Sequence, residues 1–340
     1  MKNTLKIKEV DTVVGQVSLI ELSSKDSVVT LTSYGAGIFD FKYKGMQLVA
    51  RPKTLDDYLT STAYYGKTIG RTSGRLFPPS FQIDGIDYKI KATSNDAAHL
   101  HGGNRGFSHK HFMIKAFENH QDYISVTFSY VSKDLEDGYP GVLSVDVMYV
   151  LDQNGELTIN YEAHTTKDTL CNLTNHIYFN LNENKNNLED TLIHVDADRY
   201  VEIDQQYKPI GLKTLKNSSF NLKGDKLLTD AIKKLEASGF IGFDNAFMLN
   251  KHSKDQIHLY QKSLNIGVKI ETSYPSVVIY THNYEESVEL ENCTTNGVHG
   301  SIAIECQYEP SGIYHKDLNS AILRKNERYH HFIKFIPYKK

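Results

Sequence analysis

The chain has 340 residues, of which 38 are Lys or Arg and 41 are Asp or Glu, so its formal net charge is −3. This balance lacks the basic excess of nucleic-acid-binding proteins, and no apolar run approaches the roughly 18 residues of a membrane span. The beginning of the chain has no apolar stretch typical of a secretory signal, and its three cysteines are widely spaced. We therefore expect a cytoplasmic protein with reduced thiols and with neither a nucleic-acid nor a membrane partner.

Strand and turn signals dominate the first half of the chain. Lys44-Gly45 and Asp84-Gly85 each separate two short apolar segments, which predicts two hairpins, because such pairs supply the positive φ angles of two-residue type I′ turns. Apolar and polar residues alternate over 124–130 and again over 143–151, as they do in strands with one buried face. Asn154-Gly155 follows the second run and predicts a third two-residue turn.

Helix signals are few. Residues 226–237 carry apolar side chains at the spacing of one helix face, and residues 55–59 predict a single short helical turn. The sequence shows no alternation of strands and helices of the kind that builds a parallel sheet. We therefore predict the all-β class, with one large antiparallel β-sandwich domain over residues 1–340 and a few short helices.

Arginines and histidines stand beside glycines in the first third of the chain. Arg71 and Arg75 lie on one glycine-bearing segment, and their N–H donors suit hydroxyl or carboxylate groups. A surface loop with solvated arginines is the alternative. His99 and His101 would share a face of an extended segment, which is open to a metal site or to one surface and one core histidine.

Polar groups also recur in two later segments. His176, Tyr178 and Asn180 alternate with apolar residues and could line one polar face, either as part of a ligand cleft or as an internal hydrogen-bonded network. Asp244 follows a Gly-Phe pair, and Glu305 follows an apolar approach that indicates partial burial. Burial raises the pKa of a carboxyl group and makes it a better base near neutral pH, although a hydrogen-bonded strand residue is the alternative for Glu305.

Taken in order, these clusters resemble the aldose 1-epimerase family, also called galactose mutarotases. The resemblance spans nearly the whole chain, and its most specific piece is the run from Asn175 to Leu181. The matching pieces are Ser33-Tyr34-Gly35-Ala36, Gly70–Arg75, Leu100-His101-Gly102-Gly103, Asp137-Gly138-Tyr139-Pro140-Gly141, Leu173–Leu181, Gly242-Phe243-Asp244, Ile279–Tyr284 and Glu305-Cys306-Gln307. The family fold is a large antiparallel β-sandwich, a galactose mutarotase-like supersandwich, in agreement with the periodicity.

The resemblance also implies roles for particular residues. Glu305 matches the family's general base and His176 its general acid. Arg75, His101 and Asp244 match the groups that bind the sugar hydroxyls and fix the ring. We expect Tyr178 and Gln307 to bind the substrate as well.

This chain departs from the usual family pattern at four positions. Gly74 precedes the matching arginine where Asn is frequent, so one hydroxyl contact differs. Asn245 stands where many members carry His, and Cys306 stands where many carry Thr. His282 occupies a position that Gly often holds. These departures concern the preference for a sugar more than the proposed acid and base.

The implied activity is the interconversion of the α and β anomers of a free hexose such as galactose or glucose. A base removes the proton of the C1 hydroxyl while an acid protonates the ring oxygen, and the open aldehyde closes again on its other face. A carboxylate and an imidazolium suffice, so we expect no cofactor and no metal. For the imidazole to stay protonated at neutral pH, we expect Asp244 or Glu305 to raise its pKa.

Other functions remain open from the sequence. A glycoside hydrolase could use two carboxylates, a non-catalytic carbohydrate-binding protein could share the fold, and a metal-dependent enzyme could use His99 and His101. A hexose-phosphate 1-epimerase would require further cations, for which Arg71 is the obvious spare residue. The expected partner is a small-molecule aldose, and the expected assembly is a monomer or homodimer.

Overall fold

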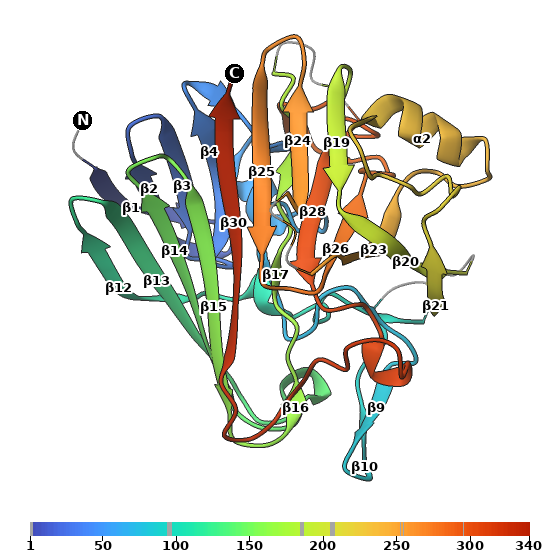
Figure 1. The fold of residues 1–340 in the computed structure, drawn as a ribbon. Helices are drawn as coiled ribbons and strands as arrows, with labels where there is room; N and C mark the ends of the chain where they lie inside the picture. Colours follow the sequence, from blue (N-terminus) through green and yellow to red (C-terminus); the bar gives the residue numbers. More distant parts are fainter. Residues whose placement is uncertain are drawn as a thin grey trace.

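The computed structural model describes residues 3–93, 97–183, 187–204, 208–251, 253, 255–294 and 296–340. A nine-stranded antiparallel sheet forms one layer, and a five-stranded and a six-stranded sheet lie side by side behind it (Figure 1). A bridge between Val49 and Phe179 connects the two rear sheets. The all-β sandwich predicted from the sequence is confirmed.

The strands follow one another along the sheets with neighbours that are mostly close in sequence. The nine-stranded sheet has, in order, β12 (Met113–Asn119), β13 (Tyr123–Ser132), β14 (Leu143–Asp152), β15 (Leu157–Thr165), β30 (Tyr329–Lys339), β25 (Ile266–Thr272), β24 (Ile257–Gln261), β19 (Thr191–Val195) and β22 (Lys226–Leu227). The five-stranded sheet has β1 (Thr4–Thr12), β2 (Gly15–Ser23), β3 (Ser27–Thr32), β4 (Gly37–Tyr43) and β5 (Met46–Gln47). The six-stranded sheet has β18 (Tyr178–Phe179), β28 (Ile302–Gln307), β26 (Ser276–Tyr280), β23 (Asp244–Leu249), β20 (Ala197–Ile203) and β21 (Pro209–Thr214).

Short paired strands and a few helices complete the described structure. The pairs are β6 (Arg51–Pro52) with β27 (Leu290–Glu291), β7 (Thr68–Ile69) with β17 (Thr174–Asn175), β8 (Arg75–Leu76) with β11 (His99–Leu100), β9 (Ser80–Ile83) with β10 (Ile86–Lys89), and β16 (Thr169–Leu170) with β29 (Ile322–Leu323). The α-helices are α1 (Leu55–Thr60) and α2 (Leu228–Glu236), and the 3₁₀-helices cover Phe107–His109, Glu136–Gly138 and Gly312–Tyr314.

Both predicted helices are confirmed. Thr54 caps α1, because its hydroxyl accepts a hydrogen bond from the backbone N–H of Asp57. In α2, Leu228, Ile232 and Leu235 are buried on one face, which explains the apolar spacing seen in the sequence. None of the described helices is long and apolar enough to cross a membrane.

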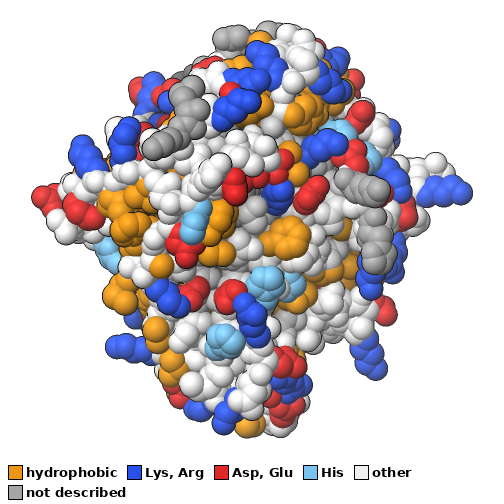
Figure 2. Space-filling view, turned by 60° about the vertical axis from the view of Figure 1, so that its left-hand side comes forward, with side chains coloured by type: hydrophobic (Ala, Val, Ile, Leu, Met, Phe, Trp, Pro, Cys, Tyr) orange, Lys and Arg blue, Asp and Glu red, His pale blue; other side chains and the backbone are white. Residues whose placement is uncertain are grey.

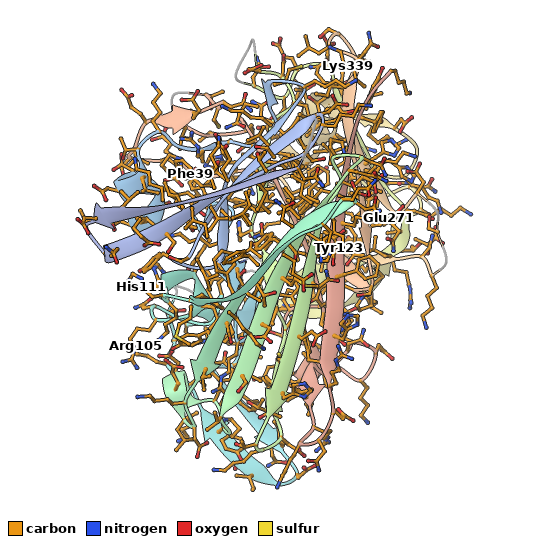
Figure 3. All side chains as sticks on the ribbon, turned by 90° about the vertical axis from the view of Figure 1, so that its left-hand side faces the viewer. Phe39, Arg105, His111, Tyr123, Glu271 and Lys339 are labelled. Carbon is orange, nitrogen blue, oxygen red and sulfur yellow. The ribbon has the colours of Figure 1, made fainter. Side chains whose placement is uncertain are left out.

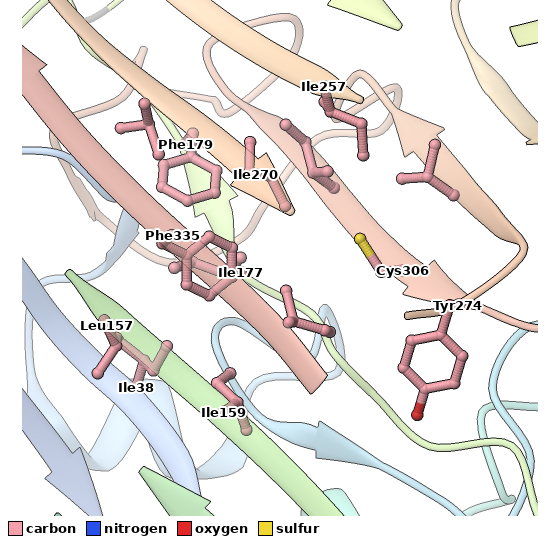
Figure 4. Packing of buried hydrophobic residues seen from close by; sticks show 14 of the residues in the cluster. Ile38, Leu157, Ile159, Ile177, Phe179, Ile257, Ile270, Tyr274, Cys306 and Phe335 are labelled. Carbon is pink, nitrogen blue, oxygen red and sulfur yellow. The ribbon is translucent and has the colours of Figure 1, made fainter. Parts of the chain in front are cut away.

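The core lies between the front sheet and the two rear sheets. Every second residue of β14 is buried, as the two-residue period predicts. Figure 4 shows how Ile177 and Phe179 pack near Phe335 of the front sheet, and how Cys306 points into the same apolar layer. One cluster of buried residues therefore reaches from β2 to β30.

Two of the three predicted hairpin turns are confirmed, and the third is wrong in its length. Lys44-Gly45 and Asp84-Gly85 have positive φ angles at both residues and join directly paired strands. Of Asn154-Gly155, by contrast, only Gly155 has a positive φ. Asp152 is the reason: its carboxylate accepts hydrogen bonds from the backbone N–H groups of Asn154 and Glu156, which stabilises a longer turn.

Candidate active site

A cavity of about 370 Å³ opens beside the six-stranded sheet. Six of the seven side chains that the sequence assigned to the site line this cavity, namely Arg75, His101, His176, Tyr178, Asp244 and Glu305. They come from five separate parts of the chain, so the fold brings together residues that are up to 230 positions apart in sequence. On the molecular face that Figure 2 shows, acidic and basic side chains are interspersed and histidines lie near the centre.

Glu305 owes its position to the pleat of β28. It pairs with Val278 of β26, and its neighbours Ile304 and Cys306 point to the opposite face, into the core. Glu305 is 2% exposed. Its carboxyl group is therefore fixed on a central strand and is almost removed from water.

His176 lies in the short connection between β17 and β18. Its backbone N–H donates to the carbonyl oxygen of Lys67, and its own carbonyl accepts from the N–H of Gly66, so the backbone is clamped on both sides. The Nε2 atom of His176 lies 3.3 Å from Oε1 of Glu305. The two residues that the sequence assigned as acid and base thus form one buried pair.

The position of the His101 side chain depends on the neighbouring residue Gly102. Its own φ is +50°, and the next residue, Gly102, has φ +79°, while a Cβ at Gly102 would lie 1.7 Å from the carbonyl oxygen of Gly70. The backbone N–H of Gly74 donates to Nδ1 of His101 at 3.2 Å. This bond assigns the proton of the neutral imidazole to Nε2, which makes His101 a hydrogen-bond donor through that atom.

Arg75 and Asp244 form a second pair in the cavity wall. Nη1 of Arg75 and Oδ2 of Asp244 are 3.3 Å apart, and the two side chains are 20% and 15% exposed. Arg75 begins β8 and lies in register with Leu100 of β11, whereas Asp244 begins β23 opposite Tyr280. Together they offer both donors and acceptors for sugar hydroxyl groups.

Burial controls the electrostatics of the site. Loss of solvent lowers the pKa of His176 to about 3 and lowers the pKa of His101 well below its ordinary value. Burial and the nearby Asp244 raise the pKa of Glu305 well above its usual range, although Arg75 acts in the opposite direction. Both shifts favour the neutral forms, with the proton on Glu305 and none on His176. The expectation that Asp244 or Glu305 raises the imidazole pKa is wrong, because burial is the largest influence on the pKa of His176 and lowers it.

Tyr178, Asn180 and Gln307 have different surroundings. Tyr178 lines the cavity, and its ring centroid lies 5.1 Å from that of His176. Asn180 instead donates to the carbonyl oxygens of Asn292 and Gly300, so it belongs to an internal network and not to the cleft. Gln307 is fully buried below Gly74 and does not line the cavity, and its amide atoms have no hydrogen-bond partner among the described residues.

Arg71 is structural and not solvated. It is 2% exposed, and its guanidinium group donates at 2.8–3.2 Å to the backbone oxygens of Ser132, Lys133, Pro140 and Gly141. These bonds direct the side chain away from the cavity. The surface-loop alternative is therefore wrong for Arg71, and the residue is not a spare cation for a phosphate.

His99 and His101 do not share a face, because the left-handed backbone at His101 breaks the extended segment. His99 is buried, and its Nδ1 lies 2.7 Å from the carbonyl oxygen of Lys91. His111 is exposed on the outside of the molecule, where its Nε2 lies 2.8 Å from the carbonyl oxygen of Val14 (Figure 3). Neither His99 nor His111 therefore reaches the cavity.

Three of the residues that depart from the family pattern do not present a side chain to the cavity. They are Asn245, Cys306 and Gly74. Asn245 donates to the carbonyl oxygen of Val201 on the far side of β23. Cys306 lies in the core. Gly74 has φ +69°, and a Cβ there would lie 2.6 Å from Pro310, so a side chain at this position would be strained in this chain.

Sequence reasoning missed several residues of the cavity. Tyr64, Tyr280 and Glu286 all line it, and the ring of Tyr64 lies 4.8 Å from that of His101. Tyr64 has φ +61°, a conformation that no sequence pattern indicates for tyrosine. Glu286 lies in a loop without any periodic signal, so nothing in the sequence distinguishes it from a solvated carboxylate.

His101, His176 and Glu305 also offer three ligand atoms within 4.8 Å of one another, a ligand set that suits zinc. Their surroundings do not. A histidine that binds a metal normally donates its other ring N–H to an acceptor, but Nδ1 of His101 faces the N–H donor of Gly74. Nδ1 of His176 has no partner among the described residues. The cluster fits hydrogen bonding to a sugar better than the coordination of a metal.

Comparisons with known proteins agree with this geometry. Residues 18–335 match the family model described as aldose 1-epimerase. Galactose mutarotase from Sus scrofa is 30% identical over 332 residues, which cover 95% of this chain and 94% of that protein. Aldose 1-epimerase from Haemophilus influenzae is 30% identical over 288 residues, with 83% of each chain covered. The crystal structure of galactose 1-epimerase from Lactobacillus acidophilus NCFM shares the fold, with a TM-score of 0.86, 23% identity and 99% of each chain covered. The chain belongs to the aldose 1-epimerase family.

Proposed function

We propose that this protein interconverts the α and β anomers of free aldoses such as galactose and glucose, with Glu305 as the base and His176 as the acid. The observation that carries the proposal is the buried pair itself, with 3.3 Å between His176 Nε2 and Glu305 Oε1 in the wall of a polar cavity. The names of the pig and Haemophilus relatives support the choice of substrate.

The reaction requires one proton on the pair. When the sugar binds, that proton moves from Glu305 to His176, which leaves a carboxylate and an imidazolium. Glu305 then takes the proton of the C1 hydroxyl while His176 gives its proton to the ring oxygen. The ring opens, the aldehyde turns about the C1–C2 bond, and the same transfers run in reverse on the other face. The pair is thus back in its neutral form while the sugar is open.

The remaining side chains hold the sugar. Arg75 donates to hydroxyl oxygens, Asp244 accepts from hydroxyl groups, and Nε2–H of His101 supplies a further donor. Fixing the ring between these groups aligns both proton transfers. Tyr178 packs beside His176 and excludes water from one side of the pair. Gln307 stays a predicted binding residue, although it does not line the cavity.

The charge of the cavity favours a neutral sugar over a sugar phosphate. Arg75 is the only Lys or Arg among the described residues that line it, whereas Asp244, Glu285, Glu286 and Glu305 all do. A phosphate would meet these acidic groups with Arg75 as the one cation in the described lining, and Arg75 is already paired with Asp244. The hexose-phosphate alternative is therefore the weaker one. One large core cluster that reaches from β2 to β30 supports a single catalytic domain, and three buried free cysteines support a location in the reducing cytoplasm.

Polarimetry of freshly dissolved α-galactose and α-glucose, with and without the protein, tests the proposal. We expect the approach to the anomeric equilibrium to accelerate in proportion to the protein concentration. Release of reducing sugar from a methyl galactoside would instead indicate a hydrolase. Binding of galactose without any acceleration would indicate a carbohydrate-binding protein.

A further inference from the structure

A second polar network lies beside the acid–base pair and is centred on His282. The Nδ1 atom of His282 lies 2.9 Å from the Ser301 hydroxyl, and its Nε2 lies 3.1 Å from the Tyr65 hydroxyl and 3.7 Å from Oε1 of Glu286. The side chain of His282 is 1% exposed and that of Glu286 is 17% exposed. Glu286 lines the cavity, so the network joins a cavity carboxyl group to buried groups behind it.

The carboxyl group of Glu286 has two neighbours in this network, His282 and Tyr65. Burial raises the pKa of the Tyr65 hydroxyl, and Glu286 raises it further, so Tyr65 remains a protonated donor beside the carboxyl oxygens. The imidazole of His282 is itself confined, because a Cβ on the adjacent Gly297 would lie 2.6 Å from its Cε1 atom. The Tyr65 ring packs 4.6 Å from that of Tyr178. The wall that holds Glu286 is therefore continuous with the wall beside His176.

The strand register places Glu286 toward the end of the cavity away from Glu305. Ser301, which contacts His282, directly precedes β28, and Glu305 follows four residues later, about 13 Å along a strand. Tyr178 and Tyr280 both pair with Ala303, between these two positions. A sugar with its C1 at Glu305 and His176 therefore extends past the tyrosines toward Glu286.

We propose that Glu286 is a substrate-binding residue that accepts a hydrogen bond from the sugar hydroxyl at C4 or C6, and that His282 and Tyr65 are positioning residues for its carboxylate. This inference rests on the proposed function, because the acid–base pair fixes which end of the sugar lies deep in the site. The inference narrows the substrate class to aldoses that carry a free hydroxyl group at C4 or C6, at the end of the sugar opposite C1. A phosphate at C6 would be repelled by the same carboxylate.

The test compares galactose with 4-deoxygalactose and 6-deoxygalactose in the wild-type protein and in the Glu286→Ala variant, with kcat and KM measured by polarimetry. We expect Glu286→Ala to raise KM for galactose about tenfold with little change in kcat, since a hydrogen bond to a charged group is lost. The wild-type protein should discriminate against one deoxy sugar by a similar factor, and this discrimination should disappear in Glu286→Ala. Tyr65→Phe should reproduce the pattern more weakly.

Glu289→Gln is the matched control, because Glu289 lies in the same loop, is 79% exposed and pairs with Lys53. It should leave both kinetic constants unchanged. Equal discrimination between galactose and both deoxy sugars in the wild-type and Glu286→Ala proteins would overturn the inference. Calorimetric titration of the three sugars distinguishes failure of this inference from failure of the proposed function. A wild-type protein without mutarotase activity would refute the proposed function, while the binding constants of the three sugars would still test the contact with Glu286. If Glu286→Ala fails to fold, the discrimination of the wild-type protein between galactose and the two deoxy sugars tests the inference, together with the weaker loss of that discrimination in Tyr65→Phe.

Discussion

The Nε2 atom of His176 lies 3.3 Å from Oε1 of Glu305, and the two side chains are 5% and 3% exposed. Two ionisable groups that are this close together and this deeply buried exchange protons with each other. Their apparent pKa values therefore describe the pair and not either residue alone. In water the same two groups would each titrate independently. The fold thus places a carboxyl group and an imidazole so close together that a proton can pass between them without rearrangement of surrounding water.

Replacing Glu305 tests the base directly. Glu305→Gln keeps the shape of the side chain but removes its ability to take a proton, so we expect kcat/KM to fall by about 10²-fold or more. Circular dichroism should show an unchanged fold. Glu271, labelled in Figure 3, lies on β25 and does not line the cavity, so Glu271→Gln should keep full activity. Retention of more than about a tenth of the wild-type kcat/KM in Glu305→Gln would remove Glu305 from the base role.

The two cavity histidines should respond differently to the same substitution. We expect His176→Asn to lower mainly kcat, because His176 transfers a proton in the transition state. His101→Asn should raise mainly KM, because the amide can still donate a hydrogen bond in place of Nε2–H. Steady-state kinetics with galactose distinguish the two outcomes. If His101→Asn proves the more damaging in kcat, the acid has been assigned to the wrong histidine.

Activity should survive exhaustive chelation. The bond from the Gly74 N–H to Nδ1 of His101 leaves that histidine without the acceptor that a metal ligand normally has for its second nitrogen. We therefore expect EDTA treatment followed by gel filtration to leave kcat/KM within experimental error. Loss of activity that one specific divalent ion restores would mean that His101, His176 and Glu305 hold a metal after all.

Arg71 should matter for stability and not for the chemistry. Arg71→Met would leave four buried backbone oxygens without their donor, which should cost about 3 kcal/mol or more of unfolding free energy in urea. Arg105→Met is the control, since the Arg105 side chain is 75% exposed and its ion pair is worth at most about 1 kcal/mol. A stable Arg71→Met protein that has lost only activity would contradict the structural role.

The sequence predicted the strands and the polar residues better than it predicted their surroundings. The two-residue period determines which face of β14 is buried, so that prediction depends on local pattern alone. The function of Arg71 depends instead on carbonyl groups from residues 132–141, which come into contact with it only in the folded chain. The same holds for Glu286, whose Oε1 lies 3.7 Å from Nε2 of His282, a contact that the sequence pattern does not indicate.

The sequence also did not allow the direction of the His176 pKa shift to be predicted. Proximity of a carboxylate to an imidazole suggests a raised imidazole pKa, and the residue types alone support that expectation. The structure reverses it, because both groups lose almost all contact with water, and burial penalises each charged form. How deeply a pair is buried follows from the packing of β28 and β18, which composition and spacing do not reveal.

These shifts predict the pH dependence of kcat/KM and the sign of each limb. The free pair is competent when it holds one proton. As the pH falls toward about 3, His176 takes up a second proton and activity should decline. As the pH rises, activity should persist until the pair loses its single proton, and the raised pKa of Glu305 moves that loss well above the ordinary glutamate value of about 4.3.

The assignment of the two limbs is therefore opposite to the one that ordinary pKa values would give. With ordinary values, Glu305 would form the acid limb and His176 the alkaline limb, and their overlap would be narrow. With the shifts of the buried pair, the alkaline limb instead reports loss of the single proton of the pair, which the raised pKa of Glu305 favours on that carboxyl group. Residual activity of Glu305→Gln, measured by polarimetry across the same pH range and corrected for spontaneous mutarotation, should lose that alkaline limb. An alkaline limb that persists unchanged in Glu305→Gln would show that another group controls it and that the proton does not rest on Glu305.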